Sequence, residues 1–332
     1  MRKLLSLALV LALAVILPVA AFAEGSLVVY TPNPDEEITY ILNTFAEKYD
    51  VDIELQSMGT GVCYTRLDSE KANPQADVMF GGVETTWTHD YPDLFETYVA
   101  NGNDKLPAEY QNPDGLITYY ILGGSCVMIV NDELEAELGI EIKSYADLLN
   151  PALKGKIAFA SPAKSGSAYT QLCTMLFSKD TIDEGWELVF NFIKNLDGKV
   201  QDSSGNCHKL VASGEYAVGV TIEKSAVLYN DNPDIAYVYP EKNSAVPDGV
   251  ALIKNCPNPD NAKLFIDFVT GLECQTAQNA DWARRPVRAD LTPVGLVGLD
   301  TLDLGNYDFA YAAKNKAEIV EKWNDLTIEA EE

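Results

Sequence analysis

The sequence has few basic residues and almost no histidine. Its 332 residues include 24 lysines and arginines against 50 aspartates and glutamates, with 2 histidines and a net charge of −26. Because binding to nucleic-acid phosphates requires clustered lysine and arginine, this balance excludes a nucleic-acid partner. The acidic excess favours solubility, and it leaves the charge of a bound small molecule open, since a local site can oppose the overall charge.

The motifs of several enzyme classes are also missing. No G-x-S-x-G turn precedes a helix, H-E-x-x-H does not occur, and the segment GTGVCYT (59–65) lacks the lysine of a P-loop. We therefore expect no enzymatic activity, no resident metal and no cofactor. A hydrolase that uses the serine-rich loops with His89 or His208 is a distant alternative.

The 6 cysteines include no C-x-x-C pair, which gives a structural zinc or redox site little support. Cys126 and Cys173 lie in apolar surroundings, which is typical of buried thiols. Cys256 and Cys274 flank the segment PDNAKLFIDFVTGL, which is typical of a helix of about three turns and would hold the two sulfurs too far apart for a disulfide. The redox state of the six cysteines stays open.

The first 23 residues contain the longest apolar run. Arg2 and Lys3 precede it, and Ala21-Phe22-Ala23 ends it, which is the order of a secretory signal peptide cleaved before Glu24. An uncleaved membrane anchor is the alternative. No cysteine stands at the cleavage point, so we expect no lipid anchor, and we expect export across the inner membrane into the periplasm.

Strand and helix patterns alternate along the rest of the chain. Short apolar runs at 26–31, 51–55 and 76–82 predict strands, and periodic apolar residues at 35–50 predict a helix between them. A second alternation follows, with helices predicted over 165–177, 184–195 and 207–213. This order predicts an α/β fold with mostly parallel pairing and right-handed crossovers.

Two long extended stretches, 115–131 and 235–255, separate the two alternating regions and predict two lobes. Small polar residues occur where several predicted strands lead into helices, as in SMGTG (57–61), FGG (80–82) and SGS (165–167). Helix N-termini carry unpaired N–H groups and partial positive charge, so such loops can hold an anionic group. Each loop alone is more consistent with ordinary helix capping, and only their recurrence in both predicted lobes favours a binding role.

Five segments together resemble a known family. They are KANPQADVMFGG (71–82), LKGKIAFASPAKSGSAYTQL (153–172), VASGEYAVGVTIE (211–223), YVYPEKNSAVPDGVALIKNCPNPDNAKLFIDF (237–268) and RRPVR (284–288). They are similar to the substrate-binding proteins of bacterial ABC importers, within the group of ferric-iron, 2-aminoethylphosphonate and sugar-phosphate binders. The resemblance implies a two-lobed periplasmic-binding-protein architecture of type 2, the Venus flytrap, with a mixed, mostly parallel sheet in each lobe.

The resemblance also implies how the chain is divided into lobes and which partners it binds. One lobe would contain residues 24–125 and 247–332, the other residues 126–246, with hinge strands near 121–131 and 237–250. The protein would be a monomer that captures a small solute between the lobes and delivers it to an ABC permease with its ATPase subunit.

By resemblance, the ligand-contacting loops contain neutral donors and two further polar residues. They are Thr31, Asn33, Thr60, Gly61, Gly82, Ser165, Gly166, Ser167, Ser203, Ser204, His208 and Glu223. Glu223 would accept from a hydroxyl or ammonium group, or it is a solvated or capping carboxylate. Trp87 and Tyr91 would cover a ligand or pack in the core, and RRPVR forms a structural ion pair or contacts the ligand.

The ligand class follows from what the loops contain. The iron-binding members of the family use adjacent tyrosines, and here the corresponding place reads Thr221-Ile222-Glu223-Lys224-Ser225. Neutral hydroxyl and N–H donors suit a phosphate or phosphonate better than Fe(III). We therefore expect an anionic organophosphorus solute. Ferric iron, or a polyamine held by Glu223 and Glu84, is the alternative.

Overall fold

The structure is a computed structural model that describes residues 25–33, 36–111, 115–122 and 126–332. The expected signal peptide, residues 1–23, lies outside the described residues. Among the helices in the described ranges, none is both long enough and apolar enough to cross a bilayer.

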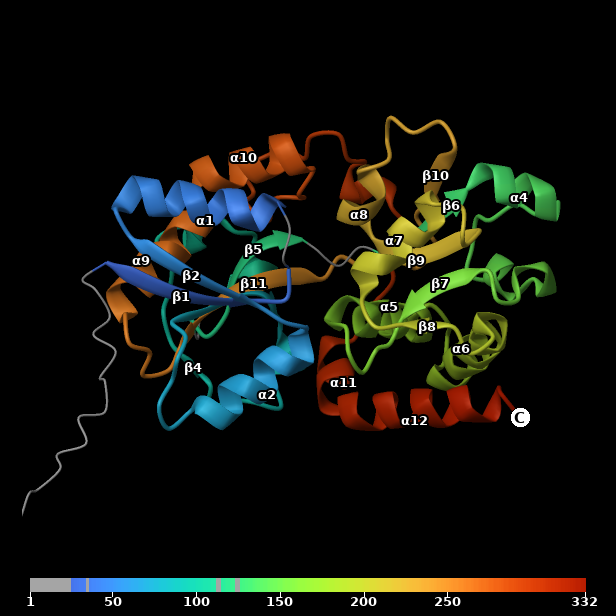
Figure 1. Cartoon of the computed structure of the whole chain (residues 1–332), viewed down its shortest axis with the longest axis horizontal. Coiled ribbons are helices and arrows are strands. Elements are labelled where there is room, and N and C mark those ends of the chain that lie inside the picture. Colours follow the sequence, from blue (N-terminus) through green and yellow to red (C-terminus); the bar gives the residue numbers. More distant parts are fainter. Residues whose placement is uncertain (1–24, 34–35, 112–114, 123–125) are drawn as a thin grey trace, which may run out of the picture.

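The described chain forms two lobes side by side along the long axis of the molecule, each built on one sheet (Figure 1). The order of strands in the first sheet is β2-β1-β3-β11-β4, with β5 also paired to β11. These strands are β1 (Ser26–Thr31), β2 (Asp52–Ser57), β3 (Val78–Val83), β4 (Phe95–Glu96), β5 (Thr118–Leu122) and β11 (Pro247–Ile253). The two-lobed α/β expectation is therefore confirmed.

The second sheet has the strand order β10-β6-β9-β7-β8. Its strands are β6 (Cys126–Asn131), β7 (Ile157–Ala160), β8 (Val200–Gln201), β9 (Val218–Ile222) and β10 (Ile235–Val238). Both sheets are mixed, as expected, but parallel pairing does not predominate. β11 pairs antiparallel with β3, and β6 pairs antiparallel with β9.

Helices cover both sheets, and those predicted over 35–50, 165–177, 184–195 and 207–213 form near the predicted residues. Those of the first lobe are α1 (Glu36–Tyr49), α2 (Thr60–Glu70), α3 (Thr85–Thr88), α9 (Pro259–Thr270) and α10 (Leu272–Trp282). The second lobe has α4 (Asp132–Leu138), α5 (Gly166–Phe177), α6 (Ile182–Leu196), α7 (Ser204–Ala212) and α8 (Glu223–Val227). Helix α9 separates Cys256 from Cys274, and all six cysteines are buried free thiols.

The last two helices depart from the expected division of the chain. Both α11 (Phe309–Lys314) and α12 (Lys316–Glu329) fall in a range expected in the first lobe. Their buried apolar residues nevertheless join the second core, although α11 also contacts α3 (Figure 1). Trp323 lies against Phe159 with ring centroids 5.4 Å apart. Residues 309–329 therefore belong to the second core, because the apolar face of α12 is buried there rather than on the first sheet.

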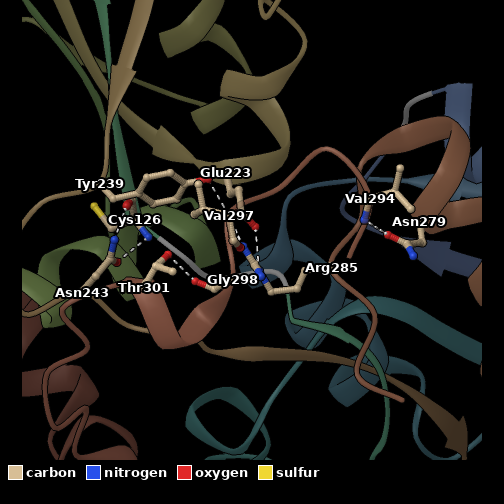
Figure 2. A network of polar contacts seen from close by, with 10 residues as sticks. All are labelled: Cys126, Glu223, Tyr239, Asn243, Asn279, Arg285, Val294, Val297, Gly298 and Thr301. Atoms are coloured by element: carbon tan, nitrogen blue, oxygen red, sulfur yellow. Dashed lines mark hydrogen bonds and ion pairs between the residues drawn. The ribbon is translucent and has the colours of Figure 1, made fainter. Parts of the chain in front are cut away.

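The chain passes between the lobes at several places. β5 and β6 lie in different sheets, as do β10 and β11, so each of the two long extended stretches leads from one sheet to the other. That they act as hinges stays a prediction. A further passage leads from α10 to α11. Figure 2 shows how two of the segments are tied together, since the side chain of Asn243 accepts from the Cys126 N–H at 2.9 Å and donates to its carbonyl at 2.7 Å.

Candidate functional site

A cavity of about 1250 Å³ lies between the lobes and is lined by both. Its first-lobe wall comes from α1, from the starts of α2 and α3, and from the ends of β3 and α10. Its second-lobe wall comes from the first turns of α5 and α7 and from α8. The ends of strands and the starts of helices therefore meet at one place, as expected for open α/β sheets.

Small residues allow close approach at the cavity, within one wall and between the two. Gly82 has a φ of +69°, and a Cβ atom there would lie 2.8 Å from Cγ of Pro32 in the same lobe. A Cβ atom on Gly166, across the cavity, would lie 3.1 Å from Oγ1 of Thr60. Gly82 is therefore needed for packing within the first lobe, and Gly166 for contact between the lobes.

The second-lobe wall presents the start of two helices. Ser165 accepts from the N–H of Ala168 and so caps α5, and Ser203 accepts from the N–H of Gly205 and so caps α7. Within the described part of the chain, the N–H groups of Gly166, Ser167 and Ser204 have no hydrogen-bond acceptor. Each helix start therefore combines unpaired donors with the positive end of the helix dipole.

Eight of the sequence-predicted residues line this cavity. They are Asn33, Thr60, Gly82, Gly166, Ser167, Ser203, Ser204 and His208. The other four are not on the lining. Thr31 is buried in β1 and accepts from Asn33 N–H at 3.1 Å, Gly61 faces the ring of Trp87, and Ser165 acts as a cap. A direct role of the eight in binding a ligand stays a prediction.

Glu223 is the fourth predicted residue that does not line the cavity. It lies in a buried ion pair instead (Figure 2). Both of its oxygens accept from Arg285, at 2.6 and 3.1 Å, and Tyr239 donates to it at 2.7 Å. Arg285 also donates to the carbonyl of Val297 at 2.8 Å. Arg285 of the RRPVR segment thus forms a structural ion pair with Glu223, whereas Arg284 of the same segment lines the cavity.

His208 lines the cavity as an uncharged ring. Its Nδ1 lies 2.9 Å from the hydroxyl of Tyr229. Burial, with a smaller contribution from the neighbouring charge of Lys209, lowers the pKa of His208 to about 4. The imidazole is therefore neutral at physiological pH and can contact a ligand by hydrogen bonding only.

A charged cluster that the sequence analysis did not single out lies at the edge of the cavity. Glu37 of α1 accepts from Lys224 of α8, across the two lobes. Arg284 lies 3.2 Å from the other oxygen of Glu37, which also accepts from Gln278 at 2.9 Å. Because Glu37 is 1% exposed, this ion pair is shielded from solvent and holds the lobes together.

Two of the carboxyl groups on the first-lobe wall have raised pKa values. Burial, and then the nearby charge of Asp248, raises the pKa of Glu84 to about 8, while Lys316 opposes the rise. Burial likewise raises the pKa of Asp248 to about 6, against Arg284 and the N–H groups of Gly249, Gly82 and Val83. Glu84 is therefore largely protonated at neutral pH, so it does not repel an anion.

No group of three or more histidine, cysteine, aspartate or glutamate side chains is arranged to hold a metal ion among the residues that the structure describes. Both walls carry hydroxyl and N–H donors, the cationic side chains of Lys209, Lys224 and Arg284 also line the cavity, and the carboxyl groups lie on the first-lobe wall. Chemically, this arrangement can hold a small polar molecule with an anionic group toward the helix starts.

Comparison with known proteins gives a family match that agrees with the resemblance noted in the sequence. The family described as bacterial extracellular solute-binding protein matches residues 41–296. The periplasmic binding protein AfuA from Actinobacillus pleuropneumoniae, solved with exogenous fructose-6-phosphate bound, has a similar structure with a TM-score of 0.85 at 28% identity. That similarity covers 92% of this chain and 99% of AfuA.

Two curated relatives are similar over most of their length. A probable ABC transporter periplasmic-binding protein, y4fP of Sinorhizobium fredii, is 26% identical over 86% of this chain and 81% of its own. A putative 2-aminoethylphosphonate-binding periplasmic protein of Salmonella typhimurium is 24% identical over 76% of this chain and 74% of its own.

Proposed function

The chain belongs to the bacterial extracellular solute-binding proteins, and on this premise we propose that it binds an organic phosphate or phosphonate between its lobes. One observation carries the proposal. The first turns of α5 and α7 open onto the same cavity, with N–H groups that have no acceptor in the described chain. A phosphate or phosphonate oxygen is a strong acceptor for such groups.

The composition of the wall supports an organic solute rather than inorganic phosphate. A cavity of about 1250 Å³ is large for one phosphate group. Asp248 on the first-lobe wall can accept from a hydroxyl or ammonium group at the other end of the same molecule. Fructose-6-phosphate, bound to AfuA, and 2-aminoethylphosphonate, named for the Salmonella relative, both have this two-ended form.

The proposed role is that of an importer component. The y4fP relative is described as an ABC transporter periplasmic-binding protein, which supports a periplasmic location and a membrane permease with its ATPase as partners. A solute that contacts both lobes favours the closed arrangement, because a ligand shifts a conformational equilibrium by its differential affinity. The permease would recognise that arrangement, and the binding protein itself would catalyse no reaction.

A thermal-shift panel tests the ligand class. The panel contains glucose 6-phosphate, fructose 6-phosphate, 2-aminoethylphosphonate, inorganic phosphate, putrescine and Fe(III)-citrate. A ligand at about 100 times its Kd adds about 2.7 kcal/mol to the free energy of unfolding, so the melting temperature should rise clearly. We expect the largest rise with an organophosphorus compound.

The variant Ser167→Leu places a bulky side chain at the start of α5, and we expect it to abolish the shift while the fold persists. Ser213→Leu is the matched control, because Ser213 is exposed at the other end of α7. A rise with Fe(III)-citrate alone, or with putrescine alone, would contradict the proposed ligand class. An unchanged shift in Ser167→Leu would remove α5 from the site.

A further inference from the structure

We propose that the indole N–H of Trp87, with the ammonium group of Lys316 behind its ring, is the first-lobe donor to the anionic group of the solute. This inference rests on the proposed function and names residues that complete its anion site. It assigns Trp87 a binding role beside its packing role.

The ring of Trp87 is held in one position. Trp87 is 5% exposed, and its ring stacks on Tyr64 with centroids 5.6 Å apart and planes 18° from parallel. The Nζ atom of Lys316 lies 3.1 Å from the centroid of the Trp87 ring, so the ring also has a cation over it. A side chain fixed on several sides presents its N–H in a defined direction.

The N–H itself has no acceptor. Nε1 of Trp87 is buried and forms no hydrogen bond with any residue that the structure describes, although Trp87 lines the cavity. A buried donor without an acceptor costs about 1–3 kcal/mol, and tryptophan usually satisfies its N–H when it is buried. A ligand oxygen in the cavity would remove this cost.

The N–H lies close to donors of the facing lobe. A Cβ atom on Gly166 would lie 3.3 Å from Nε1 of Trp87 and 3.1 Å from Oγ1 of Thr60. The indole N–H and the Thr60 hydroxyl of the first lobe therefore lie beside the start of α5, whose N–H groups are unpaired in the described chain. One anionic oxygen, or two oxygens of one phosphonate, can accept from donors of both lobes at once.

Lys316 adds a positive charge beside these neutral donors. It is the first residue of α12, its side chain is 11% exposed, and it lies 3.6 Å from Asp90. Burial lowers the pKa of Lys316 to about 8, and the charge of Asp90 limits the decrease. The ammonium form therefore predominates at neutral pH, and its charge favours an anion at the edge of the indole ring.

Matched substitutions test both residues. Trp87→Phe keeps an aromatic ring for Tyr64 and Lys316 but removes the N–H, and Lys316→Met keeps the apolar stem. Trp186→Phe and Lys322→Met are the controls, because Nζ of Lys322 lies 4.6 Å from the Trp186 ring centroid in the second core, away from the cavity. Calorimetry measures the Kd for the best organophosphorus compound of the thermal-shift panel.

We expect Trp87→Phe to weaken binding about tenfold or more, since a hydrogen bond to a charged group contributes about 1.5–3 kcal/mol. Lys316→Met should also weaken binding, and both controls should stay within about twofold of the native chain. Trp87→Phe with native affinity would overturn the inference, and so would equal losses in Trp186→Phe.

Nuclear magnetic resonance gives a readout that packing alone does not change. The chain has 4 tryptophans, so ¹⁵N-labelled protein shows few indole N–H signals. The indole signal of the native chain that is absent from the spectrum of Trp87→Phe belongs to Trp87. In the native chain this signal should move downfield when the ligand is added. If that variant does not fold, phenylalanine variants of the other three tryptophans assign the signal by elimination. An unmoved Trp87 signal at saturation would overturn the inference.

The two proposals can fail separately. If the native chain binds no organophosphorus probe, the proposed function is wrong. Native mass spectrometry then compares the solute retained on purification by the native chain and by Trp87→Phe. A lower amount in the variant supports the contact of Trp87 with a ligand of another class, and equal amounts overturn it.

Discussion

At the scale of single residues, the burial of Glu84 couples the stability of the fold to pH. Its pKa is raised from 4.5 to about 8 in the folded chain. Between these values the folded chain keeps a proton that the unfolded chain has released, so the free energy of unfolding falls as the pH rises through this window. Below about pH 4.5 the carboxyl is protonated in both states, and the cost disappears.

We predict that Glu84→Gln stabilises the protein at pH 8 relative to the native chain, and does so much less at pH 5. At pH 8 the free energy of unfolding of Glu84→Gln should exceed that of the native chain by at least about 1.4 kcal/mol. This is the energy that corresponds to one pKa unit, a tenfold change in proton affinity. Urea unfolding at the two pH values measures it. Glu36→Gln is the control, because Glu36 is exposed on the same cavity. A gain that is equal at both pH values would contradict the prediction.

Single residues also show what sequence reasoning can locate. Thr60, Gly82 and Ser167 were found because small polar residues follow apolar strands, which is a local pattern. Asp248 could have been noticed as an acidic residue inside the long extended run 235–255. The contact of Glu37 with Lys224 joins positions 187 residues apart, and no local pattern encodes such a pairing.

At the scale of elements, the packing of α6 on α5 depends on Gly185. A Cβ atom there would lie 2.3 Å from the carbonyl oxygen of Leu176 and 2.8 Å from its Cα. Both are backbone atoms of α5, so they cannot turn aside as the end of a flexible side chain would. The absence of a Cβ atom at Gly185 therefore sets the distance between the two helices.

Gly185→Ala should destabilise the fold by about 1–3 kcal/mol through overpacking, although alanine is favoured over glycine by about 1 kcal/mol in a free helix. Chemical denaturation measures the difference. Gly205→Ala in α7 is the comparison, since its nearest neighbour would be Oγ of Ser203 at an ordinary 3.5 Å. Equal stabilities of the native chain and Gly185→Ala would show that α5 and α6 can separate freely.

The elements themselves were predictable, but their assignment to lobes was less so. The strands and helices of both alternating regions follow from apolar periodicity, and they formed near the expected residues. α11 and α12 were expected in the first lobe. An amphipathic helix shows that it needs an apolar partner without showing which one, so the contact of Trp323 with Phe159 could not be read from the sequence.

At the scale of the whole molecule, the ion pair of Arg285 and Glu223 connects the RRPVR segment to the second lobe. The two side chains are 1% and 5% exposed. Removing one partner of a buried pair leaves the other charge without compensation, which costs about 3–5 kcal/mol. Replacing both by apolar residues of similar volume avoids this penalty.

We therefore predict that Arg285→Met alone lowers the free energy of unfolding by about 3–5 kcal/mol, and that the double variant Arg285→Met with Glu223→Met recovers most of the loss. Guanidinium unfolding of the single and double variants gives the comparison. If the two substitutions were simply additive, the pair would have no role in joining the lobes.

The passage from α10 to α11 has a consequence for how the protein folds. The second core contains Trp323, which follows the first-lobe elements β11, α9 and α10 along the chain. That core therefore cannot close until the chain has run through the first lobe and returned to the second. Neither lobe is encoded by one uninterrupted stretch of the gene, so a domain cut out at the hinge would lack part of its own interior.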